Sequence, residues 1–151
     1  MSDIIQEFQG EYRWLSNFWY FDGSTVEHMY QAAKAITERE RLYVLHSPSP
    51  GIAKRRGKEV MVRKDWEEVK VSVMHNLLRR KFLNSVLRKK LLDTGNAYLQ
   101  EGNKWHDTFW GVDLNTGIGQ NMLGKLIMLV RDEIRKSSND FAIDKSQFRI
   151  D

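Results

Sequence analysis

The segment 101–111 gathers the residue types that acid–base chemistry on a flat ring requires. Its eleven residues include two carboxylates, one histidine and three aromatic side chains, Trp105, Phe109 and Trp110. Two tryptophans in a polar, glycine-bounded loop are unfavourable unless they cover something. Purine and pyrimidine rings stack on such faces with about 1–3 kcal/mol per base. This loop therefore predicts a pocket that holds a flat ring.

The segment 25–34 supplies a second carboxylate, Glu27, at the start of an expected helix. We interpret the two segments as facing each other across one active site, with Glu27 and Asp107 as its catalytic carboxylates. Each carboxylate also has a structural alternative. Ser24-Thr-Val-Glu27 has the form of a capping box, in which Glu27 binds the backbone N–H of Ser24, and Asp107 suits an Asx turn or a helix cap.

Other residues are candidates for binding a phosphate or a base. Lys34 and the basic stretch around Lys58 would reach a phosphate, although such charge runs are usually solvated surface. The segment 117–121 precedes the last expected helix, and N–H groups at a helix start bind phosphate. Trp66 recurs with the apolar face of its helix, so its default role is in the core. The four histidines lie far apart without paired helical spacing, so we expect neither a metal site nor a cofactor.

The composition narrows the class of protein. The chain has 151 residues, of which 41% are hydrophobic and 29% charged, as is typical of one globular domain. The lack of cysteine excludes disulfides, a thiolate zinc site and a catalytic thiol. Neither a signal-peptide pattern nor a membrane-spanning apolar run is visible, so we expect a cytoplasmic protein that engages no membrane. The net charge of +4 suits a phosphate ester and is compatible with nucleic acid.

Start and stop signals predict a mainly α, single-domain multihelical fold with a few short β-strands. Residues 1–136 form the expected domain, and residues 137–151 form a polar C-terminal tail. The aromatic-rich stretch 8–21 is expected to be short extended pieces and loop. Capping residues predict helices over 24–36, 37–46 and 49–56 and a long helix from 65. Further helices are expected over 85–92 and 120–135, with a short strand within 97–100.

A series of ordered motifs spans residues 15–135. They are Leu-Ser-Asn-Phe at 15–18, Glu-His-Met-Tyr-Gln-Ala at 27–32, Arg-Lys-Asp-Trp at 63–66, Lys-Phe at 81–82, Leu-Leu-Asp-Thr-Gly at 91–95, Glu-Gly-Asn at 101–103, Asp-Thr-Phe-Trp-Gly at 107–111 and Gly-Gln-Asn-Met-Leu-Gly at 119–124. In their order and spacing, the chain resembles the NADAR family, also called YbiA-like N-glycosidases.

The resemblance implies a mainly helical hydrolase that acts on N-glycosyl compounds. Members act on phosphorylated ribosides of the riboflavin pathway or on ADP-ribose derivatives, including ADP-ribosylated guanine. Trp105 and His106 place the loop in the Glu-Gly-Asn-x-Trp branch, which differs from the shorter polar loop of YbiA. The matching residues are Glu27, Trp66, Asp107 and Trp110 for activity, with Asn17, Glu101 and Asn121 at further motif positions.

A mechanism follows from these residues. Cleavage of a riboside C1′–N bond passes through an oxocarbenium-like transition state, which a carboxylate stabilises while it activates water. Either Glu27 or Asp107 takes this role, and such proton handling is worth about 10²–10⁴ in rate. Trp66 and Trp110 would hold the base or cover the sugar.

Two other function classes compete with an N-glycosidase. A non-catalytic sensor would use the same aromatic pocket to bind ADP-ribose or a nucleotide. A nucleic-acid-binding protein would show strongly salt-dependent binding, and ADP-ribosylated nucleic acid would also be a substrate for the enzyme. No obligate protein partner is visible in the sequence.

Overall fold

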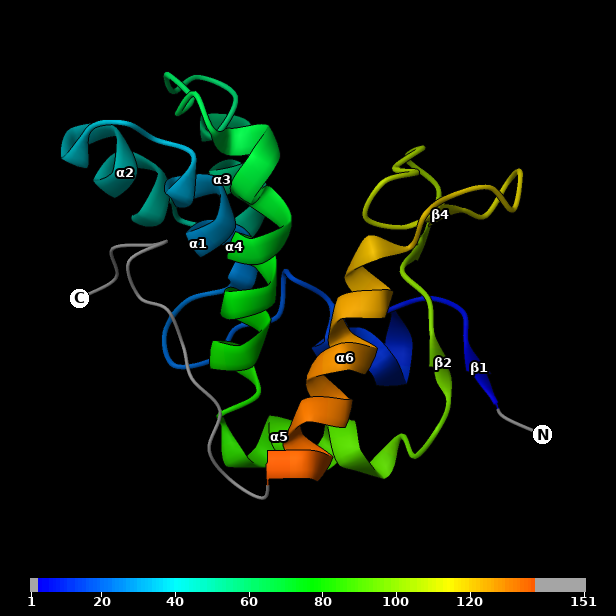
Figure 1. Cartoon of the computed structure of the whole chain (residues 1–151). Helices are drawn as coiled ribbons and strands as arrows, with labels where there is room; N and C mark the ends of the chain where they lie inside the picture. Colours follow the sequence, from blue (N-terminus) through cyan, green and yellow to red (C-terminus); the bar gives the residue numbers. More distant parts are fainter. Residues whose placement is uncertain (1–2, 138–151) are drawn as a thin grey trace. The chain divides into compact units, whose positions relative to one another are not determined.

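The computed structural model describes residues 3–137 (Figure 1). Helices dominate this part of the chain and only two-residue strands accompany them, so the predicted mainly α class is confirmed. Contacts divide the described residues into two compact units. We call residues 17–81 the α1–α4 unit, and residues 3–16 with 82–137 the α5–α6 unit. Beyond Ser137, the predicted C-terminal tail lies outside the described residues.

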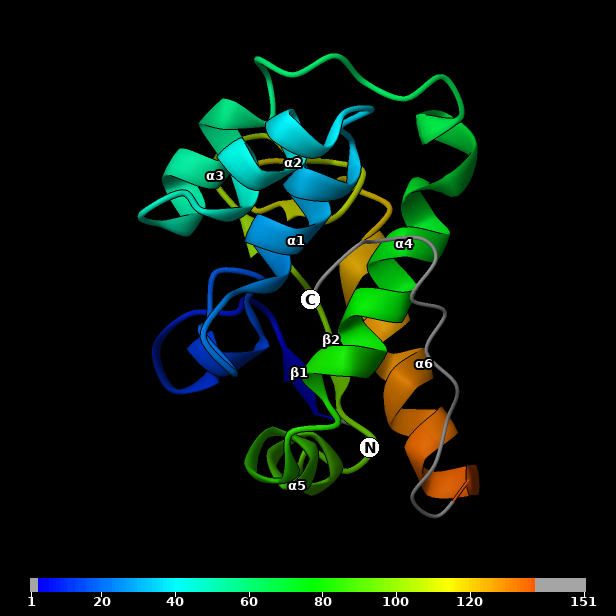
Figure 2. The ribbon, with the colours of Figure 1, turned by 90° about the vertical axis from the view of Figure 1, so that its left-hand side faces the viewer.

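The α1–α4 unit is built from four helices around α1. Helix α1 contacts each of the other three, as Figures 1 and 2 show. Val73, Leu77 and Leu78 line the buried side of α4, and each is fully buried. Full burial of such a side chain contributes about 1.5–3 kcal/mol relative to exposure. The bounds are Val26–Ala33 for α1, Glu38–Leu45 for α2, Pro50–Arg56 for α3 and Trp66–Lys81 for α4.

Two of the predicted helix starts in this unit are confirmed by their caps. Thr37 Oγ1 accepts a hydrogen bond from Glu40 N–H at 3.2 Å, and α2 follows. Ser49 Oγ accepts one from Ile52 N–H at 3.1 Å, and Pro50 occupies the first turn of α3. Such caps satisfy donors that have no partner within the helix.

The start of α1 differs from the prediction. Thr25, rather than Ser24, is the N-cap, and its Oγ1 accepts from His28 N–H at 3.1 Å. Glu27 is therefore the second residue of α1, one position too early for a capping box. The backbone N–H of Ser24 instead donates to Phe21 O at 3.0 Å. The capping role that competed with catalysis at Glu27 is thus wrong.

The α5–α6 unit combines two helices with two short parallel strand pairs. Strand β1 (Ile4–Ile5) pairs with β2 (Tyr98–Leu99), and β3 (Gly102–Asn103) pairs with β4 (Val112–Asp113). The predicted strand within 97–100 is β2. Helix α6 contacts both β2 and α5. The helices of this unit are the 3-10 helix η1 (Gly10–Leu15), α5 (Ser85–Asp93) and α6 (Met122–Ser137).

Two features of this unit depart from the expected elements. The stretch predicted as extended pieces and loop contains η1, which buries Trp14 and Leu15. Helix α6 begins two residues later than predicted because Asn121 adopts a left-handed conformation, with φ of 53°. Farther along, Gly124 permits the close approach of α6 to β2, since a Cβ on this residue would overlap Leu99 O.

Within residues 3–137, none of the helices combines the length with the apolar character that a bilayer span needs.

The position of the α1 cap is testable by a pair of alanine substitutions. We expect Thr25→Ala to lower the free energy of unfolding by about 1 kcal/mol, because it removes the acceptor for His28 N–H. Ser24→Ala, the matched control, should change it by less than about 0.5 kcal/mol. Urea denaturation followed by circular dichroism measures both, and the reverse order of effects would restore the Ser24 cap.

Candidate functional site

Glu27 lies in the first turn of α1 and is only 8% exposed. Its backbone N–H donates to Asn17 O at 3.0 Å. Its carboxylate oxygen Oε2 accepts a hydrogen bond from Gln31 Nε2 at 2.6 Å. The two side chains meet because residues four apart share one face of a helix. A carboxylate with this degree of burial is the kind of group that active sites contain.

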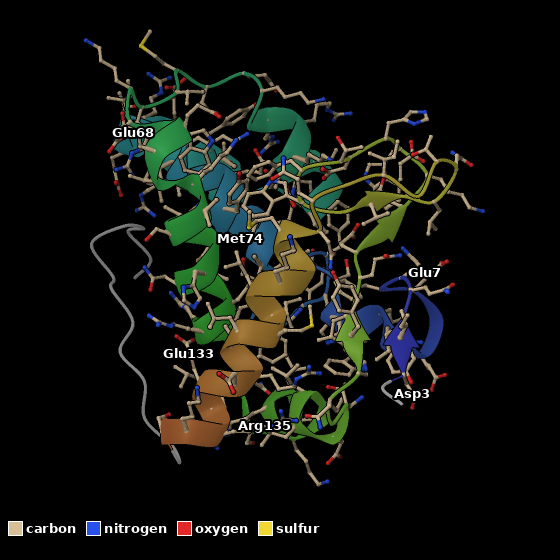
Figure 3. The ribbon with its side chains drawn as sticks, turned by 45° about the vertical axis from the view of Figure 1, so that its right-hand side comes forward. Asp3, Glu7, Glu68, Met74, Glu133 and Arg135 are labelled. Atoms are coloured by element: carbon tan, nitrogen blue, oxygen red, sulfur yellow. The ribbon has the colours of Figure 1, made fainter. Side chains whose placement is uncertain are left out.

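Asn17 joins Glu27 to the long helix α4. Besides accepting from Glu27 N–H through its backbone, Asn17 places its side-chain Nδ2 at 3.6 Å from Met74 Sδ. Figure 3 labels Met74 on α4. The side-chain oxygen of Asn17 is buried without a hydrogen-bond partner. Asn17 therefore contacts the predicted site through its backbone and presents a buried acceptor beside it.

His28, the neighbour of Glu27, is fully engaged in the fold. Its Nε2 lies 2.9 Å from Ser47 O, and its Nδ1 lies 2.7 Å from Thr25 Oγ1. A carbonyl oxygen only accepts, so Nε2 carries the proton and Nδ1 accepts from the Thr25 hydroxyl. Both ring nitrogens thus have partners within the fold.

Two aromatic rings and a lysine gather at the other end of α1. The ring centroids of Tyr30 and Trp66 are 5.1 Å apart and tilted by 56°. The Lys34 ammonium lies 5.8 Å from the Tyr30 centroid and 6.0 Å from the Trp66 centroid. Such separations allow a cation–π attraction with both rings. Trp66 is buried, as its helical periodicity predicts, and still borders Lys34.

The electrostatics tie this lysine to other predicted residues. Burial lowers the pKa of Lys34, because desolvation disfavours the charged ammonium. The nearby Glu27 carboxylate opposes this effect, whereas Lys58 and Lys54 add to it. The α1–α4 unit therefore brings together five predicted site residues: Asn17, Glu27, Lys34, Lys58 and Trp66.

The loop between β3 and β4 is held closed by one amide side chain. Asn103 Nδ2 donates to Asp107 O at 2.9 Å, and Asn103 Oδ1 accepts from Asp107 N–H at 3.0 Å. Asp107 Oδ1 in turn accepts from the N–H groups of Phe109 and Trp110, at 3.1 and 2.9 Å. The latter bonds form the Asx turn that was the structural alternative for Asp107.

Asn121 connects this loop to the start of α6. It is 2% exposed, and its Oδ1 accepts from Glu101 N–H at 2.9 Å. Its Nδ2 donates to Leu99 O at 2.9 Å and lies 3.2 Å from Tyr98 Oη. These bonds make Asn121 an anchor of the loop and leave its predicted contact with substrate as a prediction.

Trp110 contacts the first turn of α6 and its own neighbour Phe109. Its carbonyl accepts from Leu123 N–H at 2.9 Å, and its ring forms an edge-to-face pair with Phe109 at 4.9 Å. The α5–α6 unit thus brings together the other four predicted site residues: Glu101, Asp107, Trp110 and Asn121. Glu27 and Asp107 belong to different units, so their shared site stays a prediction.

One pair in this loop was not anticipated from the sequence. His106 Nδ1 lies 2.7 Å from Asp113 Oδ2, and Asp113 Oδ1 accepts from Asn115 N–H at 2.8 Å. The bond with His106, and then that with Asn115, lower the pKa of the Asp113 carboxyl. His106 adopts a φ of 67°, and its neighbour Trp105 is 54% exposed. Parallel pairing of β3 with β4 closes the loop and brings the pair together, and no short sequence pattern indicates it.

The last residue of the α1–α4 unit is a buried lysine. Lys81, the last residue of α4, is fully buried, and desolvation lowers its pKa from 10.5 to about 7.

Among residues 3–137 there is no group of three or more histidine, aspartate or glutamate side chains that could hold a metal ion.

The chain belongs to the NADAR family, because residues 6–135 match the family model for the NADAR domain. The fold agrees: the solution structure of the Escherichia coli protein YbiA matches with a TM-score of 0.78 and 35% sequence identity, covering 94% of this chain and 91% of that one. The predicted single-domain YbiA-like fold is thereby confirmed.

Curated relatives carry two kinds of name. The N-glycosidase Npun_R5314 of Nostoc punctiforme is 37% identical over 118 residues, which cover 74% of each chain. The N-glycosidase YbiA of Escherichia coli K12 is 40% identical over 113 residues, which cover 73% of this chain and 69% of that protein. The riboflavin biosynthesis protein VVA0006 of Vibrio vulnificus is 39% identical, but the match spans only 30% of its length.

The buried lysine makes a prediction about pH. Between about 7 and 10.5 the unfolded chain binds more protons at Lys81 than the folded chain does, so this residue makes the free energy of unfolding rise with pH. The slope is at most about 1.4 kcal/mol per pH unit. We therefore expect Lys81→Met to be more stable relative to the wild type at pH 7 than at pH 9.5, measured by urea unfolding. A stability difference that stays constant with pH would contradict the assignment.

Proposed function

We propose that this protein hydrolyses the C1′–N bond of a phosphorylated riboside or an ADP-ribose derivative and releases a free base. It is a hydrolase that acts on N-glycosyl bonds, as the relatives named N-glycosidases support. The observation that carries the proposal is the buried Glu27 carboxylate, which shares the α1–α4 unit with Lys34 and two aromatic rings.

Glu27 has the properties that the reaction needs. As the C1′–N bond breaks, its electron pair leaves with the base and positive charge develops on the sugar. A carboxylate held beside the sugar stabilises this charge and accepts a proton from the attacking water. Gln31 fixes one Glu27 oxygen by a 2.6 Å hydrogen bond, so the carboxylate does not have to reorient during the reaction.

The cations around Glu27 suit the phosphate of the proposed substrate. Lys34 feels the charges of Lys58 and Lys54, so several ammonium groups meet in one region of the unit. Their mutual repulsion is relieved when a phosphate binds between them. Because Lys34 is partly desolvated, its attraction to a phosphate is stronger than that of a fully hydrated lysine.

Aromatic side chains suit the base or the sugar of the same substrate. Trp66 stands beside Lys34, and we assign it to covering the ribose or its base. Trp110 and Asp107 come from the closed loop of the α5–α6 unit. We assign the base-stacking face to Trp110 and keep Asp107 as the second candidate carboxylate, with Oδ1 already used for the turn.

Two substrate classes fit these features. Ribosylamino-pyrimidine phosphates of the riboflavin pathway are favoured by relatives named riboflavin biosynthesis proteins. ADP-ribosylated guanine, free or in nucleic acid, is the second class, and the exposed Trp105 offers it a further stacking surface. A panel of both classes with NAD and ADP-ribose, followed by mass detection of released base, identifies the substrate.

The role of Glu27 is tested by Glu27→Gln on the best substrate of that panel. We expect kcat/KM to fall by about 10²–10⁴, because the amide neither accepts the proton nor stabilises the cation as well. Thermal unfolding and circular dichroism establish that the variant folds. Full hydrolysis by a folded Glu27→Gln protein would exclude the mechanism, and ligand-induced stabilisation without any base release would favour the sensor.

Asp107→Asn separates the charge of Asp107 from its turn. Asparagine keeps the Oδ1 acceptor for the N–H groups of Phe109 and Trp110, so the loop should retain its structure. If Asp107 is a catalytic carboxylate, kcat falls by about 10² or more. Wild-type kcat in this variant would leave Asp107 with the turn alone.

A further inference from the structure

The two polar atoms of the Gln31 side chain have unequal surroundings. Nε2 donates to the Glu27 carboxylate, whereas Oε1 is buried and has no hydrogen-bond partner. The whole residue is only 5% exposed. A buried acceptor without a partner costs about 1–3 kcal/mol of folding free energy. An apolar side chain of similar length would avoid this cost, so the unpaired acceptor itself does not explain a glutamine here.

What the amide supplies is a directed donor to Glu27. The hydrogen bond joins two side chains on one face of α1, both of them buried. A donor aimed at one carboxylate oxygen fixes the rotamer of the side chain. A fixed orientation is what a group that stabilises a sugar cation and accepts a proton from water needs.

Gly57, the C-cap of α3, leaves room for this amide. A Cβ built on Gly57 would overlap Gln31 Oε1 and would lie 2.9 Å from Gln31 Cδ. The backbone of Gly57 has φ of −60° and ψ of −21°, a conformation open to any residue. The space taken by Gln31, and not the backbone, is therefore what requires glycine at this position.

The same stretch of chain carries the cations of the proposed phosphate site. Lys54 lies on the last turn of α3, and Lys58 directly follows Gly57. Both lower the pKa of Lys34, whereas Glu27 raises it. The end of α3 thus packs against Gln31, and its lysines interact electrostatically with Lys34.

We propose that Gln31 is a positioning residue for the catalytic carboxylate of Glu27, and that Gly57 leaves the space which this orientation of Gln31 needs. This inference rests on the proposed function, because it assigns Gln31 through Glu27. The alternative is that Gln31 only supports the fold. The two differ in what removal of the amide does to kcat.

Gln31→Met removes the donor and the unpaired acceptor while keeping the length of the side chain. We expect kcat to fall by about 10²-fold, since misplacement of a catalytic group costs about that much. KM should change little, and in the unfolding temperature the loss of the unpaired acceptor should partly offset the loss of the hydrogen bond to Glu27. A lower unfolding temperature with kcat unchanged would assign Gln31 to the fold and overturn the proposal.

Gly57→Ala tests the role of this space while the Gln31 and Glu27 side chains stay unchanged. The added methyl displaces the end of a flexible side chain, so the protein should fold, while kcat falls in the same direction as in Gln31→Met. Gly51→Ala is the matched control on the same helix, because a Cβ there meets only Ser49 Oγ at 3.9 Å. It should keep wild-type kcat and unfold at the same or a slightly higher temperature.

The set of variants separates this inference from the proposed function. If Glu27→Gln loses hydrolysis while folded Gln31→Met or Gly57→Ala keeps full kcat, Glu27 is catalytic and the positioning role of Gln31 is wrong. If Gln31→Met does not fold, Gly57→Ala alone decides. If Glu27→Gln itself keeps full hydrolysis, the proposed function fails first.

Discussion

The burial of α1 on every side is the constraint on which its surroundings depend. All eight of its residues are buried, including three that are polar. A buried polar side chain is tolerated only when it is hydrogen-bonded, so each of these three requires a partner nearby. His28 finds Thr25 and Ser47, and Glu27 finds Gln31. The charge of Glu27 is thus placed inside a helical unit by neighbours that leave it little freedom.

This arrangement explains why the cationic and aromatic groups gather where they do. Lys34 follows α1 by one residue, so it extends the line of polar groups that begins with Glu27. The rings of Tyr30 and Trp66 border its ammonium and exclude water from part of it. Desolvation lowers the pKa of Lys34, whereas the Glu27 carboxylate raises it. These opposed influences act on the side chain that we propose as a ligand of the phosphate.

The loop from Gly102 to Asp113 is held in place mainly by side-chain hydrogen bonds. Its strands are only two residues long, so ladder hydrogen bonds alone do not hold it. Asn103, Asp107 and Asn121 supply side-chain bonds to the backbone in their place. Binding residues are often found on loops that a rigid scaffold positions. Here side chains of the loop itself supply much of this scaffold. Trp105 and His106 remain exposed on the loop.

Much of this molecule was determined by the sequence alone, wherever the signal is local. Thr37 and Ser49 mark helix starts because caps act within a few residues. The ordered motifs identify the family and supply seven of the nine predicted site residues, whereas Lys34 and Lys58 were predicted from the charge pattern.

The tertiary structure decided what depends on distant parts of the chain. It moved the α1 cap from Ser24 to Thr25, because the turn at Phe21 already occupies the Ser24 N–H. It joined His106 to Asp113, and it placed Gly57 against Gln31, 26 residues earlier in the chain. Such contacts arise from packing between elements, and no spacing along the chain records which surfaces meet.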